Sequence, residues 1–277
     1  MLNAPVTLIP AKLLLTLAAL FLVACSDDKQ SDAPRCVAAG LVVSGAAGAG
    51  GLGGDTGGDA LFVPQGINVT ARPGINSVFN VIALTLRPGA SGAEVYAAVR
   101  NDGQILACNA SFSVELHDKD DQTLGAGISG LQARRFYRFT DGSGSIASCV
   151  APGEVVMIAI QRLDLDAPIE DVKSVVYQSN YWGNLPLAAI EGVSLTGVQA
   201  VTRGTGVAYT GALVNGLDTA LSGPTVAVFP LSAVGRPLDV AYGGSSVVLP
   251  RCGTWDFETS PISASGVAYD AYPMGGP

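Results

Sequence analysis

Apolar and polar residues alternate along most of the chain in short runs that end at glycine, proline or asparagine-aspartate turns. The run 111–117 places Phe112, Val114 and Leu116 on one face of an extended chain and polar side chains on the other, as in a half-buried β-strand. After the N-terminal region, no window of about eleven residues has the three-four spacing of an amphipathic helix. The pattern therefore predicts an all-β fold of antiparallel sandwiches. Further runs of this kind occupy residues 77–89, 93–101 (where Val95, Ala97 and Val99 mark the expected core face), 153–166 and 172–180.

The N-terminus departs from this pattern. Lys12 is the one charged residue among the first 24, and the uncharged apolar run 13–24 follows it. A helix of that length rises about 18 Å, too little for a hydrocarbon core of about 30 Å. A basic residue followed by a short apolar run predicts a secretory signal peptide at residues 1–24.

The end of this run resembles a bacterial lipobox, Leu22-Val23-Ala24-Cys25. That resemblance implies cleavage before Cys25, a diacylglycerol on its sulfur and a fatty acyl chain such as palmitate on its new amine. Ser26, in place of Asp, implies sorting to the outer membrane in that family. Two or more acyl chains give stable anchoring.

Residues 25–60 are rich in Ser, Asp, Gly and Ala, which predicts a flexible tether. Gly48, Gly50 and Gly53 spell the fingerprint of a dinucleotide-binding turn, but more glycines and a proline follow where that turn requires a helix. We therefore interpret these glycines as linker and expect no cofactor.

The remainder divides into two stretches with the same strand pattern, 61–183 and 184–277. Both share the order strand, Asn turn, strand, polar turn, which suggests an internal repeat. We expect two immunoglobulin-like sandwiches in tandem, with one larger β-domain as the alternative. A shift of 114 positions lays 97–124 on 211–238, Asn101 on Asn215, Val114 on Val228 and Leu124 on Leu238.

Charge limits the class of partner. The net charge is −8, and removal of residues 1–24 with Lys12 would make it −9. An acidic chain is a poor partner for nucleic acid, because contacts of basic residues with phosphates supply most of the affinity of a protein for nucleic acid. It is also repelled by anionic headgroups, so we expect membrane contact through the lipid on Cys25.

The residues from 95 to 127, with 149–160 after them, resemble the FxLYD-type domain of bacterial envelope lipoproteins. In that pattern a strand ends in Asn before a small turn, a hydrophobic strand leads to an Asp-containing turn, and Pro-Gly-Glu precedes a last strand. The resemblance covers about 80 residues. It implies an immunoglobulin-like sandwich without known catalysis, used for recognition or as a spacer. The matching residues are Asn101, Asp118, Pro152, Gly153 and Glu154.

Four cysteines follow Cys25, an even number that suggests disulfides in an exported protein, with three possible connectivities. Cys108 opens one predicted strand and Cys149 precedes the turn into another, so a bridge between them would close a loop of about 40 residues. Cys36 and Cys252 are then left for a second bridge. With no C-x-x-C and one His, we expect no structural zinc.

Few residues offer chemistry. His117 is the sole histidine, no serine sits in G-x-S-x-G, and the charges around His117 predict a solvated turn. Neither acidic cluster has the spacing of a calcium loop. We therefore expect no enzyme and no metal, with a β-sandwich hydrolase as a less favoured alternative. The clusters are Asp118, Asp120 and Asp121, and Asp164, Asp166, Glu170 and Asp171.

Two stretches could mediate recognition. Residues 133–139 interleave arginines with aromatics, the favoured anchors of binding surfaces, although a strand with buried aromatics and snorkelling arginines gives the same pattern. Tyr181 and Trp182 could stack on a sugar ring or pack between the two halves. The arginines are Arg134, Arg135 and Arg138, and the aromatics Phe136, Tyr137 and Phe139.

These observations together predict a non-catalytic, lipid-anchored protein of the cell envelope that acts as a binding or structural module. Its location would be the outer membrane, on the periplasmic or surface face. Its partner would be an unknown envelope protein or glycan. A carbohydrate- or peptidoglycan-binding lipoprotein is the alternative function.

Overall fold

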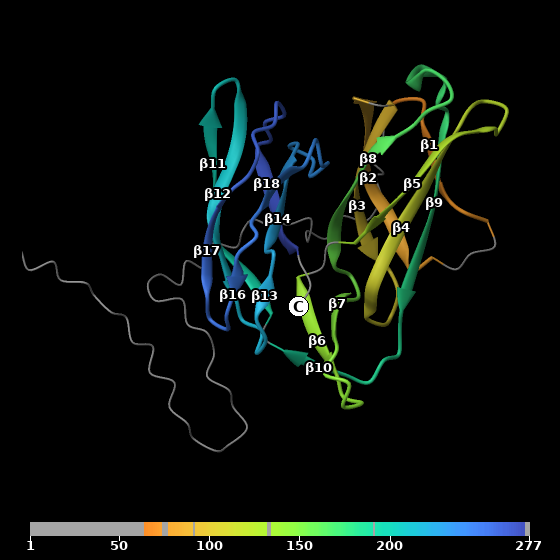
Figure 1. Ribbon diagram of the computed structural model, residues 1–277. Coiled ribbons are helices and arrows are strands. Elements are labelled where there is room, and N and C mark those ends of the chain that lie inside the picture. The colour runs from red at the N-terminus through yellow and green to blue at the C-terminus, as the bar shows by residue number, and fades with distance from the viewer. Residues whose placement is uncertain (1–63, 74–76, 91, 132–133, 191, 275–277) are drawn as a thin grey trace, which may run out of the picture. The chain divides into compact units, whose positions relative to one another are not determined.

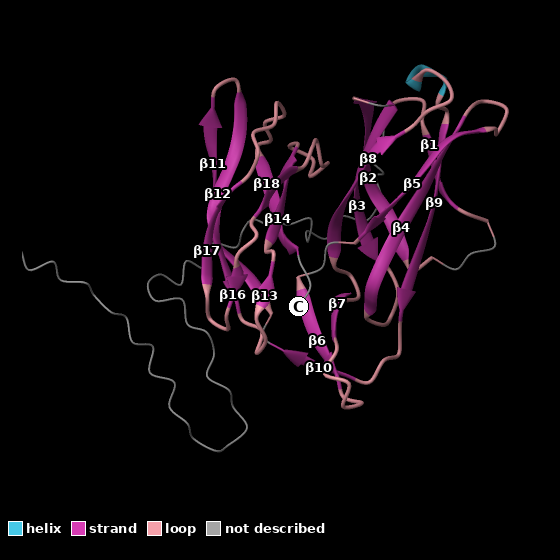
Figure 2. Ribbon diagram, viewed as in Figure 1, coloured by secondary structure: helices cyan, strands magenta, loops and turns pink. Residues whose placement is uncertain are grey.

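The computed structural model describes residues 64–73, 77–90, 92–131, 134–190 and 192–274. The expected signal peptide (1–24) and tether (25–60) lie outside them. The described residues form β-strands and one short 3-10 turn, η1 (Ile169–Asp171), so the predicted all-β class is confirmed (Figure 2). They contain no helix long and apolar enough to cross a membrane.

Two sheets make up the first half of the fold, which extends past the predicted boundary at residue 183 to include β10 at residues 187–190 (Figure 1). All pairings within them are antiparallel except that of β1 with β9, which is parallel. One sheet has the order β2 (Phe79–Gly89), β3 (Gly92–Asn101), β8 (Val155–Leu163). The other has the order β1 (Asn68–Ala71), β9 (Ser174–Trp182), β4 (Ala107–His117), β7 (Ile146–Val150), β6 (Arg135–Phe139), β10 (Leu187–Ile190), with β5 (Thr123–Gly130) also paired to β4.

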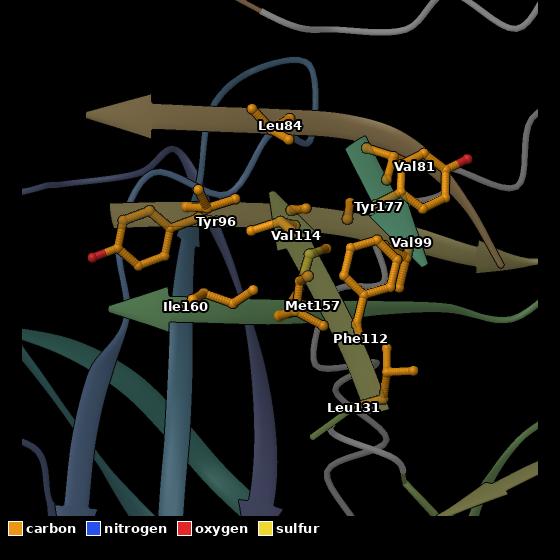
Figure 3. Packing of buried hydrophobic residues seen from close by; sticks show 14 of the residues in the cluster. Val81, Leu84, Tyr96, Val99, Phe112, Val114, Leu131, Met157, Ile160 and Tyr177 are labelled. Atoms are coloured by element: carbon orange, nitrogen blue, oxygen red, sulfur yellow. The ribbon is translucent and has the colours of Figure 1, made fainter. Parts of the chain in front are cut away.

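The first core lies between these sheets. Phe112 and Val114 of β4 belong to this core together with Val81 of β2 and Val99 of β3 (Figure 3). The ring of Phe112 stacks on that of Tyr177 at 5.2 Å between centroids. The alternation in 111–117 therefore identifies the core face of this strand, because Phe112, Val114 and Leu116 are buried whereas Ser111, Ser113 and Glu115 are partly exposed.

The second half also has two principal sheets. Their facing sides enclose a second core that includes Tyr209, Leu213 and Phe257 from one sheet and Val226 and Val228 from the other. The strands are β11 (Val193–Arg203), β12 (Gly206–Asn215) and β17 (Thr254–Glu258) in one sheet, β15 (Ala241–Gly244), β14 (Thr225–Leu231) and β18 (Ala268–Met274) in the other, and the short pair β13 (Leu221–Ser222) and β16 (Val248–Leu249).

The two halves repeat one scheme of pairing. The sheet β2-β3-β8 corresponds to β11-β12-β17, and Asn101 and Asn215 each end the central strand. The backbone carbonyl of each Asn accepts a hydrogen bond from a residue in the left-handed conformation, Gly153 in the first half and Cys252 in the second. The structure therefore places the two asparagines at equivalent positions.

Strand β14 is buried on both faces. Val226 and Val228 belong to the second core, whereas Ala227 and Phe229 belong to the first. The sheet that contains β14 therefore closes the second sandwich with one face and packs on the first half with the other. A strand in this position loses polar alternation, because neither face meets water.

Strand β3 shows the same effect. The alternation of Val95, Ala97 and Val99 predicts one buried face, but Tyr96 and Ala98 are buried as well. Both faces of this strand are therefore buried, since the second half of the chain covers the side that carries Tyr96.

Candidate functional site

The three predicted arginines are all engaged in ion pairs. Arg135 lies 3.1 Å from Glu154, Arg134 pairs with Asp270, and Arg138 pairs with Asp218. Asp270 and Asp218 belong to the second half of the chain, so Arg134 and Arg138 connect the halves. The hydrogen bond between Arg138 and Asp218 lowers the pKa of that carboxyl group.

The aromatic residues of this segment pack inward. Strand β6 lies between β7 and β10, and its Phe136 packs against the second core. Gly192 permits this contact, because a Cβ on it would lie 2.2 Å from the Phe136 ring. Tyr137 and Phe139 pack around the buried disulfide. All three aromatic side chains are therefore partly buried against the protein.

A hollow of about 330 Å³ lies beside this segment. Arg134 and Arg135 are among its polar lining residues, and Ile190, Val193 and Val214 are among the apolar ones. An apolar surface with a few polar groups is typical of sites for small organic ligands. Because both arginines already have carboxylate partners, the net charge that they present here is small.

Arg134 also covers a buried tyrosine. Its guanidinium carbon lies 4.6 Å from the centre of the Tyr272 ring. The Tyr272 hydroxyl donates to Asp270 at 2.6 Å and accepts from the backbone N–H of Met157 at 3.1 Å. Burial raises the pKa of Tyr272. A hydrogen bond to the β8 backbone therefore joins the two halves at a fully buried point.

A second polar cluster joins the halves around Arg87. Arg87 lies 2.8 Å from both Glu94 and Asp239, and its guanidinium carbon lies 4.9 Å from the centre of the Tyr96 ring. The Tyr96 hydroxyl donates to Glu94 at 2.6 Å, and burial raises the pKa of Tyr96. Sequence reasoning missed this cluster, because no local pattern relates Arg87 to an aspartate about 150 residues away.

Tyr181 and Trp182 do not act as a pair. Successive residues of a strand point to opposite faces, and the Tyr181 ring meets Phe79 edge-on at 6.5 Å beside the first core. Trp182 is 55% exposed and meets Phe139 at 6.5 Å. The exposed tryptophan therefore keeps a surface on which a ligand ring could stack, whereas Tyr181 does not.

The predicted bridge between Cys108 and Cys149 is present, and both cysteines are buried. These residues are direct cross-strand partners of β4 and β7, which explains why their side chains meet. Cys252 is disulfide-bonded. Cys36, its expected partner, and the lipidation candidate Cys25 lie outside the described residues.

His117 is not on a solvated turn, as its neighbours had suggested, but is buried at the end of β4. Its ring nitrogens lie 2.8 Å from Asp121 and 3.3 Å from Glu115, and Arg72 pairs with the same Glu115. Asp118 accepts backbone hydrogen bonds within its own turn, which lowers its pKa. Among the described residues, no three His, Cys, Asp or Glu side chains are grouped to hold a metal ion.

Comparison with known proteins gives no name to this arrangement. No family model and no curated protein matches the chain. The resemblance to FxLYD-type domains therefore stays a prediction from residues 95–160, and the geometry described above carries the functional inference.

Proposed function

We propose that this protein is a lipid-anchored component of the bacterial cell envelope, and that it acts there as a non-catalytic binding or structural module. Cys25 would carry the lipid and residues 25–60 would form the tether. The β-sandwiches would stand at the outer membrane, on its periplasmic or surface face. The support for the anchor is the sequence motif that ends at Cys25.

One observation carries the proposed role. The polar side chains that are candidates for catalysis form hydrogen bonds and ion pairs between strands and between the two halves of the chain. His117 ties β4 to the following turn, Arg87 and Arg134 hold carboxylates of the second half, and Tyr272 donates within the same network. Groups held in this way stabilise a surface for recognition, because their interactions are already satisfied within the fold.

Two measurements test the proposal. Metabolic labelling with a fatty-acid analogue should tag the wild type and not Cys25→Ser, and equal labelling of both would refute the anchor. The acylated protein should also retain an envelope component reproducibly after cross-linking in cells. Recovery of no component, together with hydrolytic activity that His117→Ala abolishes, would overturn the non-catalytic module.

Binding of carbohydrate at Trp182 is a second candidate function, favoured by the exposure of that side chain and its contact with Phe139. Aromatic rings stack on the apolar faces of other rings, and the indole of Trp182 meets Phe139 edge to face. A glycan array with the wild type and Trp182→Ala tests this. Tyr181→Phe is the matched control, because Tyr181 packs on the protein and its substitution should leave binding unchanged.

A further inference from the structure

The outer face of the sheet β11-β12-β17 carries a shallow groove with a volume of about 550 Å³. It lies on the side of this sheet that faces away from the second core, because Tyr209, Leu213 and Phe257 occupy the inward positions of the same strands. The lining residues belong to all three strands. They are Thr196, Gly197, Gln199, Thr210, Gly211, Ala212, Asp256, Phe257 and Glu258.

The strand register explains the shape of the groove. Ala212 of the central strand β12 lies between Thr196 of β11 and Asp256 of β17. Thr210, two residues earlier on β12, lies between Gln199 and Glu258 in the same way. Ala212 and Thr210 thus form the floor, and the polar side chains of β11 and β17 form two walls about 10 Å apart, which is two strand spacings.

Two glycines help to shape the groove. The register of β11 shifts between Thr196 and Gln199, where Gly197 adopts a φ of +61°. Gly211 lies opposite Phe257, and a Cβ there would lie 2.9 Å from that ring. Gly211 therefore lets the Phe257 ring pack closely against β12 on the inner side of the sheet.

The charges of the groove are nearly balanced. Arg203 donates from Nε and Nη2 to the two carboxylate oxygens of Glu258, at 2.7 and 3.0 Å. Asp256 is exposed and has no ion-pair partner in the part of the chain that the structure describes. One carboxylate, one amide and two hydroxyl groups therefore face the groove with a net charge of about −1.

We propose that this groove binds an extended, neutral oligosaccharide. Sugar hydroxyl groups donate to carboxylates and both donate to and accept from amides and hydroxyls, which is the set of groups on the two walls. The floor of Ala212 and Thr210 runs along β12 for about 7 Å, enough for one or two rings of a longer chain. The inference rests on the proposed function as a binding module and names its ligand class and site, separate from Trp182.

The competing occupant is a cationic peptide, attracted by Asp256 and Glu258. The bidentate pair with Arg203 argues against it, because Glu258 is already neutralised and one carboxylate remains. With no exposed aromatic ring among the lining residues, the sugar would bind through hydrogen bonds alone and therefore weakly.

The test is an NMR titration of the full mature chain with soluble hexasaccharides of β-1,4-glucose, β-1,4-N-acetylglucosamine and α-1,4-glucose. At least one hexamer should shift amide signals of residues 196–199, 210–212 and 256–258 at concentrations up to about 10 mM. Ala212→Leu fills the floor and Asp256→Ala removes the free carboxylate, so each should weaken binding about tenfold or more. Thr202→Ala, exposed on β11 outside the lining, is the matched control and should leave binding unchanged.

Three results would overturn the proposal that this groove binds an oligosaccharide. These are no shift with any hexamer, shifts confined to the surroundings of Trp182, and tighter binding of tetralysine than of every hexamer at residues 256–258. Retention of an envelope component by Ala212→Leu in the cross-linking experiment would then show that the module function stands without this ligand. Loss of both retention and glycan binding in the wild type would reject the two proposals together.

Discussion

Single buried side chains hold each half of this molecule at its turns, and the two asparagines are the clearest case. Asn101 and Asn215 are both fully buried. In each, the amide nitrogen donates to the carbonyl four residues later and to a carbonyl of the strand that returns beside the turn. The amide oxygen accepts from the backbone N–H two residues later. An asparagine side chain therefore pairs with the backbone groups of the equivalent turn in each half.

Replacement of either asparagine by Ala should lower the free energy of unfolding by about 3 kcal/mol, because one backbone N–H and at least two backbone carbonyls lose their partner. Urea denaturation measures this directly. Asn180→Ala, on an exposed position of β9, is the control and should cost less than about 0.5 kcal/mol. If Asn101→Ala unfolds with the same free energy as Asn180→Ala, the hydrogen bonds of the Asn101 side chain are not formed.

At the scale of the strand, close packing depends on where side chains are absent. Strand β5 lies against β8 with glycines at the contact, and a Cβ on Gly127 would lie 2.5 Å from Ile160 and 2.9 Å from Leu163. A Cβ on Gly130 of the same strand would have no heavy atom within 4 Å apart from those of its chain neighbours. The two glycines therefore differ in what they permit.

Gly127→Ala should destabilise the protein by about 1–3 kcal/mol through overpacking of the first core. Gly130→Ala is the matched substitution in the same strand, and thermal denaturation of the two variants gives the comparison. Equal melting temperatures for the variants would contradict the packing of β5 on β8.

The strand scale also shows how far the sequence alone reaches. The β-class, the core face of 111–117 and the Cys108–Cys149 bridge followed from local spacing, because each depends on residues of one sheet. The double burial of β14 and the partners of Arg134 did not, since they depend on where the second half packs. The partial burial of Tyr181 beside an exposed Trp182 follows from alternation once the strand is extended to include both.

The whole molecule is held across its halves by apolar packing and by buried tyrosines with their partners. Phe229, Leu231 and Tyr272 of the second half belong to the first core. Tyr96 and Tyr272 are both fully buried, and burial raises the pKa of each phenol. The pKa of each phenol is higher in the folded protein than its ordinary value of about 10. The contribution of these phenols to the free energy of unfolding is therefore fully present below about pH 10 and declines as the pH rises further.

The free energy of unfolding should therefore stay level from pH 8 to about pH 10 and then fall by about 1.4 kcal/mol per pH unit for each of these tyrosines. The unfolded chain releases both phenolic protons in this range, whereas the folded chain keeps them. Urea curves followed by circular dichroism at successive pH values give the slope. Tyr272→Phe should make it shallower, and an unchanged slope in that variant would exclude Tyr272 as a source.

The central structural claim is that the two halves unfold as one cooperative unit, and the chain carries its own reporters of this. Its two tryptophans lie one in each half, Trp182 on β9 and Trp255 on β17. The variants Trp182→Phe and Trp255→Phe each leave a single fluorophore. Shared packing predicts that the urea midpoints of the two variants coincide, after correction for any change in overall stability seen by circular dichroism. Two separated transitions, with one tryptophan reporting a half that stays folded after the other has unfolded, would contradict it.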